Sequence, residues 1–324
     1  MYKTLLGATG LQVSALAMGT DVLGSKIDQE TTFALLDYYF GEGGNFIDTG
    51  NFYASWLPGC QGGESETVIG AWMKARGNRD EIVLSSKLAF DYPGCDGGLS
   101  AREIERECEK SLKRLQTDRL DLYYAHRDDR DVSQEETMNA FDRLIKAGKV
   151  RALGASNVAV WRIAAANTIA KAHHLTPYSV VQQRYTYLRP RHGADFGPQI
   201  VIGPELKDFA LTENVALVAY SVLLQGAYSR TERELPVQFA GPESDDRLKA
   251  LAALAKEIGR SVNQVIIAWM RQSTPSVLPI IAGSKIDQLK ENIAALDITL
   301  TKEQMHTLDT AGNPTAEQGW IQPT

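Results

Sequence analysis

Four ionisable side chains stand at, or just after, short apolar runs of the sequence. Asp48 and Lys87 each close one such run, and His126 directly follows a third. Tyr53 comes a few residues beyond Asp48. If these runs are neighbouring parallel strands of a barrel, their carboxyl ends share one rim. A carboxylate, a phenol, an ammonium and an imidazole can then meet there.

This combination suits the addition of a hydride to a carbonyl group. The carbonyl oxygen gains negative charge and needs a proton donor and hydrogen bonds that strengthen in the transition state. A phenol with an ordinary pKa of about 10 is a poor donor near neutral pH, but a nearby ammonium stabilises the phenolate and lowers that pKa. Tyr53 is therefore the candidate proton donor, tuned by Lys87 and Asp48. His126 is the candidate group that orients the substrate oxygen.

Each of these residues also has a purely structural interpretation. An Asp and a Lys at strand ends often form a salt bridge that supports a loop, and a Tyr next to Phe52 often only packs. For one residue alone the structural interpretation is favoured. Four such residues at the ends of three consecutive units favour chemistry.

The elements that must position these residues alternate regularly along the chain. The expected strands are Leu16–Gly19, Phe46–Asp48, Ile82–Lys87, Leu120–Ala125, Val150–Ala155, Val180–Gln183, Val215–Ala219 and Val277–Ile281. The expected helices are Gln29–Gly41, Glu64–Ala75, Ser100–Leu115, Gln134–Ala147, Val158–His173, Pro204–Thr212, Asp245–Ile258 and Ile286–Leu296. Short apolar strands alternating with amphipathic helices indicate parallel strands joined by crossovers. Eight such units predict an α/β fold, a (β/α)8 TIM barrel, as a single domain over residues 1–324.

Several segments depart from this alternation. The opening residues predict an N-terminal β-hairpin with its turn near Gly7–Gly10. We expect Ser261–Ser273 to be an additional helix before the last strand, and Thr301–Thr310 to be a further C-terminal helix, followed by a tail through Gly319 and Trp320. The polar connection Gln225–Ser244 is long enough to predict a binding loop.

Composition narrows the class of protein. The 324 residues are 44% hydrophobic and 23% charged, which is ordinary for a globular protein. A net charge of −6 argues against nucleic acid as a partner. Three cysteines without CxxC spacing predict neither a disulfide framework nor a zinc site, and we expect no metal.

The same features suggest where the protein works. The first residues lack a secretory signal pattern. The longest apolar stretch, near Val215–Leu224, is too short to cross a bilayer. We therefore expect a cytoplasmic protein that acts on a small molecule and has no membrane partner, and its oligomeric state stays open.

Taken in order, these motifs resemble those of the aldo-keto reductases. The similar stretches are FIDTGNFY at 46–53, SSK at 85–87, LDLYYAH at 120–126, GASN at 154–157, Gln182, AYS at 219–221, GSK at 283–285 and Glu291-Asn292. They cover nearly the whole chain. The resemblance implies reversible hydride transfer between NADPH and an aldehyde or ketone, with the roles given above for the four ionisable residues.

The resemblance also implies a set of cofactor contacts. Ser156, Asn157 and Gln182 would hold the nicotinamide carboxamide, and Tyr220 would stack on the ring. The remaining contacts would be Gly19, Thr20, Asp21 and Asp48 at the first two strand ends, Ser221, Leu223, Gln225 and Gly226 at the pyrophosphate, and Gly283, Ser284, Lys285, Gln288, Glu291 and Asn292 around the adenosine.

The preference for NADPH depends on Lys285. A cation beside a helix N-terminus favours binding of the 2′-phosphate, although Lys285 could equally be an ordinary surface lysine. Ala282 and Gln288 stand where more basic members of the family carry Lys and Arg. NADH is therefore the alternative cofactor.

Residues just past the second to fourth strands are candidates for substrate contacts. They are Tyr53, Trp56, Phe90, His126, Arg127 and Asp128. A charged rim over Arg127, Asp128 and Asp129 would suit a sugar or a sugar-derived carbonyl, whereas a merely solvated loop is the structural alternative.

Two other functions fit parts of the pattern. Some barrels of this kind bind nucleotide as regulatory or sensor subunits and turn over slowly. A barrel hydrolase or lyase would instead use paired carboxylates or a divalent metal, and Asp48 is the one clear carboxylate at the expected mouth besides Asp128 and Asp129.

Overall fold

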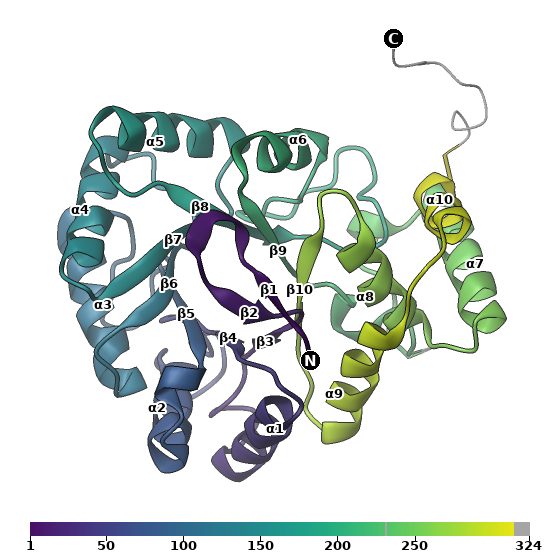
Figure 1. The fold of residues 1–324 in the computed structure, drawn as a ribbon, viewed down its shortest axis with the longest axis horizontal. Coiled ribbons are helices and arrows are strands. Elements are labelled where there is room, and N and C mark those ends of the chain that lie inside the picture. Colours follow the sequence, from purple (N-terminus) through teal and green to yellow (C-terminus); the bar gives the residue numbers. More distant parts are fainter. Residues whose placement is uncertain (231, 314–324) are drawn as a thin grey trace.

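A computed structural model describes residues 1–230 and 232–313. Eight parallel strands close into a barrel in the order β10-β3-β4-β5-β6-β7-β8-β9 (Figure 1). They are β3 (Ala17–Gly19), β4 (Phe46–Asp48), β5 (Val83–Leu88), β6 (Leu120–Ala125), β7 (Val150–Ser156), β8 (Tyr178–Arg184), β9 (Ala216–Tyr220) and β10 (Val277–Ile281). The predicted (β/α)8 barrel is confirmed.

Helices surround this barrel. They are α1 (Gln29–Gly41), α2 (Glu64–Arg76), α3 (Ala101–Leu115), α4 (Gln134–Lys146), α5 (Val160–Ala172), α6 (Pro204–Glu213), α7 (Pro242–Glu257), α8 (Val262–Gln272), α9 (Ile286–Ile293) and α10 (Lys302–Thr310). The helix start predicted from Ser100 is confirmed, because the Ser100 side chain caps α3 by accepting a hydrogen bond from the Glu103 amide.

The predicted N-terminal hairpin is present and closes one end of the barrel (Figure 1). Its strands β1 (Lys3–Leu5) and β2 (Gln12–Ser14) pair antiparallel around a short 3-10 turn, η1 (Gly7–Thr9). Buried hairpin side chains, including Leu11 and Val13, join the inward-facing residues of the first strand layer in one core cluster. The hairpin therefore closes this end of the barrel with apolar side chains. The candidate active site lies at the opposite end, where the strands have their carboxyl ends.

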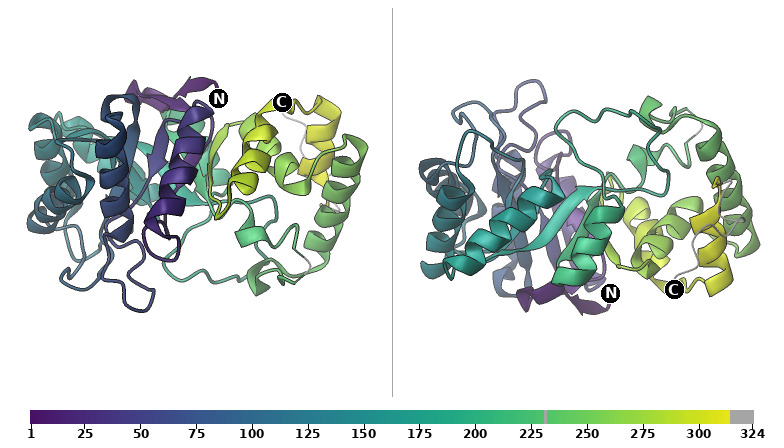
Figure 2. Two further views of the ribbon diagram at one scale, coloured as in Figure 1. Left: turned by 90° about the horizontal axis from the view of Figure 1, so that it is seen from below. Right: turned by 90° about the horizontal axis from the view of Figure 1, so that it is seen from above.

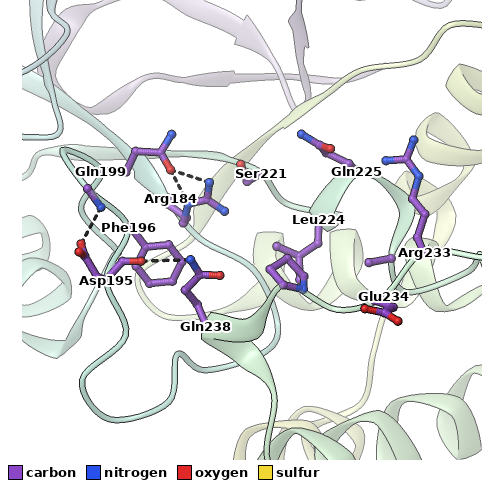
Figure 3. Close-up of a pocket in the computed structure, with 13 residues that line it drawn as sticks. Arg184, Asp195, Phe196, Gln199, Ser221, Leu224, Gln225, Arg233, Glu234 and Gln238 are labelled. Carbon is purple, nitrogen blue, oxygen red and sulfur yellow. Dashed lines mark hydrogen bonds between the residues drawn. The ribbon is translucent and has the colours of Figure 1, made fainter.

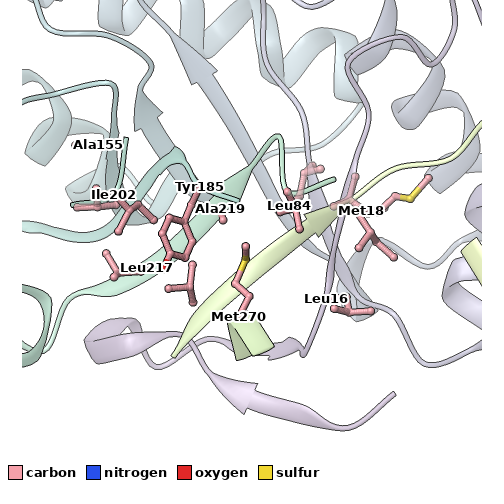
Figure 4. Close-up of a cluster of buried hydrophobic side chains, with 14 of the residues drawn as sticks. Leu16, Met18, Leu84, Ala155, Tyr185, Ile202, Leu217, Ala219 and Met270 are labelled. Carbon is pink, nitrogen blue, oxygen red and sulfur yellow. The ribbon is translucent and has the colours of Figure 1, made fainter. Parts of the chain in front are cut away.

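A second and larger core lies between the barrel and its helices. Successive strand residues point to opposite faces, so Leu16, Met18 and Leu84 face the helix layer (Figure 4). Full burial of an aliphatic side chain of this size stabilises the fold by about 1.5–3 kcal/mol. This core holds the strand ends, and thus the site, in fixed positions.

The prediction that Ser261–Ser273 is the additional helix is wrong. Helix α8 packs directly on β10, whereas α7 packs on α8 and α10, outside the barrel layer (Figure 2). The reason is visible in their burial: Val265–Met270 of α8 are all buried, so this helix is enclosed on nearly every side. The extra layer is therefore α7 with α10.

Buried polar contacts join this outer layer to the barrel side. Arg247 of α7 donates to the carbonyl oxygens of Tyr187 and Ala311, and the indole of Trp269 donates to Asp309 of α10 at 2.7 Å. The predicted long connection after β9 is present: it holds two 3-10 turns, η3 (Leu224–Gly226) and η4 (Val237–Phe239), before α7.

Two further short 3-10 turns are η2 (Arg79–Glu81) and η5 (Ala294–Asp297). None of the helices in the described part of the chain combines the length and the apolar character that a bilayer crossing requires. The expected tail with Gly319 and Trp320 lies outside the described residues.

Candidate active site

The centre of the site is the fully buried ammonium of Lys87. Its Nζ donates to Asp48 Oδ2 at 2.6 Å, to the Thr49 carbonyl oxygen at 2.7 Å and to Tyr53 Oη at 2.8 Å. The amine and phenol that the sequence placed on separate segments therefore meet. Parallel pairing of β4 with β5 aligns Asp48 with Ser85, and the alternation of side chains turns Ser85 and Lys87 inward together.

The Asp48 carboxylate is held on both oxygens. While Oδ2 takes the ammonium, Oδ1 accepts from Ser85 Oγ at 2.7 Å and from Gln182 Nε2 at 2.9 Å. A buried ion pair is favourable only when further hydrogen bonds satisfy its remaining atoms. Ser85 and Gln182 meet this need, so Asp48 and Lys87 form a fixed unit from three strands.

Burial shifts both members of the proton-donating pair. It lowers the pKa of Lys87, against the opposing charge of Asp48. It raises the pKa of Tyr53 well above 10, and the charge of Asp48 adds to this rise. The lowering of the Tyr53 pKa expected from Lys87 stays a prediction, because desolvation of the phenolate is the largest cause of the rise and opposes it. Tyr53 is a neutral phenol that keeps its proton.

A buried carboxylate on α3 holds the loop that carries Tyr53. Glu107 Oε2 accepts from Asn51 Nδ2 at 2.9 Å and from the Tyr92 hydroxyl at 2.5 Å. Burial would raise the Glu107 pKa, but hydrogen bonds from Lys110, Tyr92 and Asn51 outweigh it and hold that pKa below its usual value. Glu107 thus joins the loop after β4 to the loop after β5.

The His126 ring lies beside the phenol, with its centroid 5.9 Å from that of Tyr53. It is buried, and burial, with a smaller effect of Lys87, holds its pKa well below 6.5. The imidazole is therefore neutral near pH 7. Its Nδ1 is buried without a hydrogen-bond partner among the described residues.

Five rings, which we call the aromatic wall, line this side of the mouth: Phe52, Tyr53, Trp56, Phe90 and His126. The Phe52 ring lies 4.7 Å from Phe90, 5.2 Å from Trp56 and 5.1 Å from His126, measured between centroids. Trp56 is 50% exposed, which leaves the outer end of the wall open to solvent. Such a surface suits a flat apolar group.

The residues of the expected charged rim, Arg127, Asp128 and Asp129, contact other residues of the protein. Asp128 pairs with Arg162 at 2.9 Å, and Asp129 accepts from the Leu99 amide at 2.7 Å. The Arg127 guanidinium lies over the Phe90 ring, 5.0 Å from its centroid. The carboxylates therefore stabilise the loop itself, and Arg127 extends the aromatic wall.

Amide groups gather beside the mouth where nicotinamide contacts were expected. Asn157 Nδ2 donates to the His126 carbonyl oxygen at 2.9 Å, and Asn157 Oδ1 accepts from the Tyr220 hydroxyl at 2.7 Å. Ser156, Asn157 and Gln182 are all buried. Asn157 and Ser221 have positive φ angles, 56° and 58°. Strained backbone of this kind clusters at binding sites.

The strand ends next to this group have structural contacts. Thr20 Oγ1 donates to the Asp48 carbonyl oxygen at 2.8 Å, and Gly19 leaves no room for a side chain because a Cβ would lie 2.7 Å from Ile280. Asp21 is exposed. Leu223, Gln225 and Gly226 lie at the start of the loop after β9, where Gln225 has a φ of 56°.

The expected adenosine segment surrounds the start of α9. Gln288 Oε1 accepts from the Ser284 amide at 2.8 Å, and Glu291 accepts from Ser261 Oγ at 2.6 Å. Asn292 Nδ2 makes a long contact of 3.4 Å with the Ala282 carbonyl oxygen. Lys285 is exposed at the N-cap position of α9, next to Gly283. No hydrogen bond or ion pair joins its ammonium to another described residue, so it is free to meet an anion.

The sequence-based predictions missed several supporting residues. Ser85 lies two residues before Lys87, a strand spacing that would have indicated a shared inward face. Phe52 precedes Tyr53, and the sequence predicts no role of its own for it. Thr49 acts through its backbone oxygen and Glu107 through a distant helix, and neither has a sequence signal.

One cluster of a thiol and two carboxylates in the described part of the chain has the residue types of a metal site. Ligand atoms of Cys95, Glu103 and Glu107 lie within 4.8 Å of one another. Arg106 pairs with Glu103 at 2.5 Å, and Lys110 pairs with Glu107 at 2.8 Å. These cations already balance the carboxylates.

The fold and site define a (β/α)8-barrel oxidoreductase. The model of the aldo/keto reductase family matches residues 15–313, and the chain belongs to this family. It is 32% identical to norsolorinic acid reductase B of Dothistroma septosporum, over 96% of this chain and 81% of that protein. It is also 32% identical to an aryl-alcohol dehydrogenase [NADP(+)] of Phanerodontia chrysosporium, over 95% of this chain and 85% of that protein.

A solved structure supports the same family assignment. The thermostable aldo-keto reductase Tm1743, in complex with the inhibitor epalrestat, superimposes with a TM-score of 0.76 at 27% identity. The match covers 96% of this chain and 99% of that one. The family and the class of carbonyl oxidoreductase predicted from the sequence are confirmed.

Proposed function

We propose that this protein reduces an aldehyde or ketone with NADPH, reversibly, and that Tyr53 is the general acid. The observation that carries the proposal is the 2.8 Å contact between Tyr53 Oη and Nζ of Lys87, whose side chain is fully buried. Bound NADPH supplies the hydride. The protein supplies the proton and the position of the carbonyl.

The geometry explains how the proton moves. All three protons of the Lys87 ammonium have acceptors, one of which is Tyr53 Oη, so the proton of Tyr53 is directed elsewhere. The phenol keeps this proton until the carbonyl oxygen becomes an alkoxide, which is a much stronger base. Lys87 then stabilises the phenolate that remains. In the oxidation of an alcohol the same groups act in reverse.

The residues present fit a nicotinamide cofactor. Buried Ser156, Asn157 and Gln182 offer amide and hydroxyl groups that complement a carboxamide, and Tyr220 offers a half-buried ring beside them. Holding the ring in one orientation supplies proximity to the substrate. His126 would donate to the carbonyl oxygen and orient it toward Tyr53.

Lys285 supports NADPH rather than NADH, because its ammonium is exposed and unpaired where the 2′-phosphate is expected. Lys285→Met should raise the KM for NADPH about tenfold and leave that for NADH nearly unchanged, since a charged hydrogen bond contributes about 1.5–3 kcal/mol. Lys290→Met, which removes an exposed cation from the same helix, is the matched control. Equal effects on both cofactors would remove Lys285 from this role.

The aromatic wall supports an aromatic carbonyl as substrate, rather than a sugar. The name of the Phanerodontia relative points the same way. Benzaldehyde and DL-glyceraldehyde, assayed with NADPH, test this choice. We expect a higher kcat/KM for benzaldehyde. A preference for glyceraldehyde would restore the sugar hypothesis, and tight NADPH binding without turnover would indicate the nucleotide sensor.

A further inference from the structure

The cavity between the loops after β8 and β9 lies on the expected path of the cofactor. It has a volume of about 640 Å³, and its wall includes Ser221 and Gln225, two of the expected pyrophosphate contacts (Figure 3). The interior of the barrel holds a residue whose contacts the cofactor does not explain. This residue is Tyr124, which touches the ammonium of Lys87 from within the barrel.

The register of the barrel strands brings Tyr124 to Lys87. In the pairing of β5 with β6 the two residues lie directly opposite each other. Opposite residues of neighbouring parallel strands point to the same face of the sheet, so both side chains point into the barrel. The Tyr124 ring is fully buried and packs in the inner core cluster with Leu122 and Val180. Tyr124 is therefore the residue at which the apolar interior meets the buried ammonium.

A glycine on the next strand makes room for the Tyr124 ring. The pairing of β6 with β7 places Gly154 opposite Tyr124. A Cβ atom on Gly154 would lie 2.3 Å from Cδ1 of the Tyr124 ring, which is too close for any side chain at this position. The ring thus occupies the space that a side chain on Gly154 would need, and the large and the small residue fit each other.

The Lys87 ammonium lies over two aromatic rings. Its Nζ is 4.7 Å from the centroid of the Tyr53 ring and 5.8 Å from that of the Tyr124 ring. The face of an aromatic ring is partly negative and attracts a cation within about 6 Å, more strongly where water is excluded. All three Nζ protons already have acceptors. The Tyr124 ring therefore stabilises the ammonium without using another proton.

The ring of Tyr124, rather than its hydroxyl, makes this contact. The hydroxyl oxygen is buried without a hydrogen-bond partner among the described residues, and a buried hydroxyl in that condition destabilises a protein. Tyr123, the preceding residue of β6, is equally buried, and its hydroxyl also lacks a partner within this part of the chain. Its side chain, however, belongs to the outer core, where its ring contacts Phe141. Tyr123 is thus a matched control for Tyr124.

We propose that Tyr124 is a positioning residue for the reaction: its ring holds the Lys87 ammonium in place and keeps it charged beside Tyr53. Lys87 must be charged when Tyr53 has given up its proton, because a neutral amine would leave the phenolate without a counter-charge. For its effect on turnover, the inference rests on the proposed function. The effect of the ring on the charge of Lys87 is independent of that function.

Other groups also act on the charge of Lys87. Burial lowers the pKa of Lys87, and the carboxylate of Asp48 opposes this effect. The titratable or charged groups around the ammonium are Asp48 on β4, Tyr53 after β4, Tyr124 on β6, His126 after β6, Asp21 after β3 and Glu66 on α2. A test must therefore change the face of the Tyr124 ring and leave burial and these other groups as they are.

Fluorination of the ring meets this requirement. The residue 3,4,5-trifluorophenylalanine in place of Tyr124 nearly keeps the shape of the ring in Tyr124→Phe, but it withdraws negative charge from the ring face. NMR titration of protein with ¹³C at the lysine Cε measures the pKa of Lys87 without cofactor or substrate, and the signal is assigned by its absence in Lys87→Met. We expect Tyr124→Phe to titrate like wild type and the fluorinated ring to lower the Lys87 pKa by about 0.5–1 pH unit. The alkaline limb of kcat for benzaldehyde should move in the same direction.

The same fluorinated residue in place of Tyr123, compared with Tyr123→Phe, is the control, and it should leave the Lys87 titration unchanged. Two results would overturn the role of Tyr124. One is an equal shift with the fluorinated ring at either position, and the other is an unchanged Lys87 titration when the ring replaces Tyr124. A shifted titration with an unchanged pH dependence of kcat would instead contradict the role of Lys87 in the proposed function, so the two failures are distinguishable.

Discussion

Lys87 Nζ lies 2.8 Å from Tyr53 Oη and donates to it. The direction of this hydrogen bond matters, because the ammonium has no lone pair and the phenol oxygen must accept. The phenol proton is thereby left for a substrate. Burial keeps the phenol protonated, and this contact sets the direction in which the proton can be donated.

The buried partner of Lys87 should be essential for stability. In Asp48→Asn the ammonium stays buried without its counter-charge, so we expect the free energy of unfolding to fall by about 3–5 kcal/mol. Urea unfolding monitored by circular dichroism measures this change. Asp80→Asn is the control, since Asp80 pairs with Arg119 but its side chain is 88% exposed, and it should cost less than about 1 kcal/mol. Similar losses in both variants would contradict the description of Asp48 and Lys87 as a fixed unit.

Glu107 should contribute stability that depends on pH. Its pKa is held below the usual value, so its contribution is complete above about pH 4.3 and is lost as the pH falls through the lower folded value. Glu107→Gln should therefore destabilise the protein at pH 7 by about 1–3 kcal/mol. The difference from wild type should shrink on acidification. Glu105→Gln, on the same helix, is the comparison, because the Glu105 side chain is 47% exposed. A difference between Glu107→Gln and wild type that stays constant down to acid pH would be inconsistent with this role.

His126 should not titrate in the range where the enzyme works. Its pKa lies well below 6.5 because it is buried, so kcat/KM should show no step between pH 6 and 8 that His126→Asn removes. The unfolded chain takes up this proton near pH 6.5 while the folded chain does not. Stability is therefore complete above that pH and declines below it, by at most about 1.4 kcal/mol per pH unit. His126→Asn should flatten this decline and exposed His192→Asn should not. An unchanged slope in His126→Asn would show that the imidazole is already charged.

Much of the fold follows from local patterns. The eight apolar runs and the helical spacing between them define the barrel, and Asp48, Lys87 and His126 stand at run ends, so parallel strands must bring them to one rim. Spacing also indicates that Ser85 and Gln182 point inward. These inferences need only the periods of strands and helices.

Other features depend on contacts that no local pattern encodes. Whether α7 or α8 belongs to the barrel layer depends on which elements enclose Val265–Met270. The rise in the Tyr53 pKa is set by burial, which the sequence does not give. Glu107 acts through Asn51 and Tyr92 on distant loops, so it could not be placed before the fold was known.

The most direct test of the central claim is the single-turnover rate of Tyr53→Phe with saturating NADPH and benzaldehyde. Because this change removes only the hydroxyl, we predict a rate about 10²–10⁴-fold below wild type, with the Kd for NADPH within twofold. A near-normal rate would show that another group donates the proton and would contradict the account.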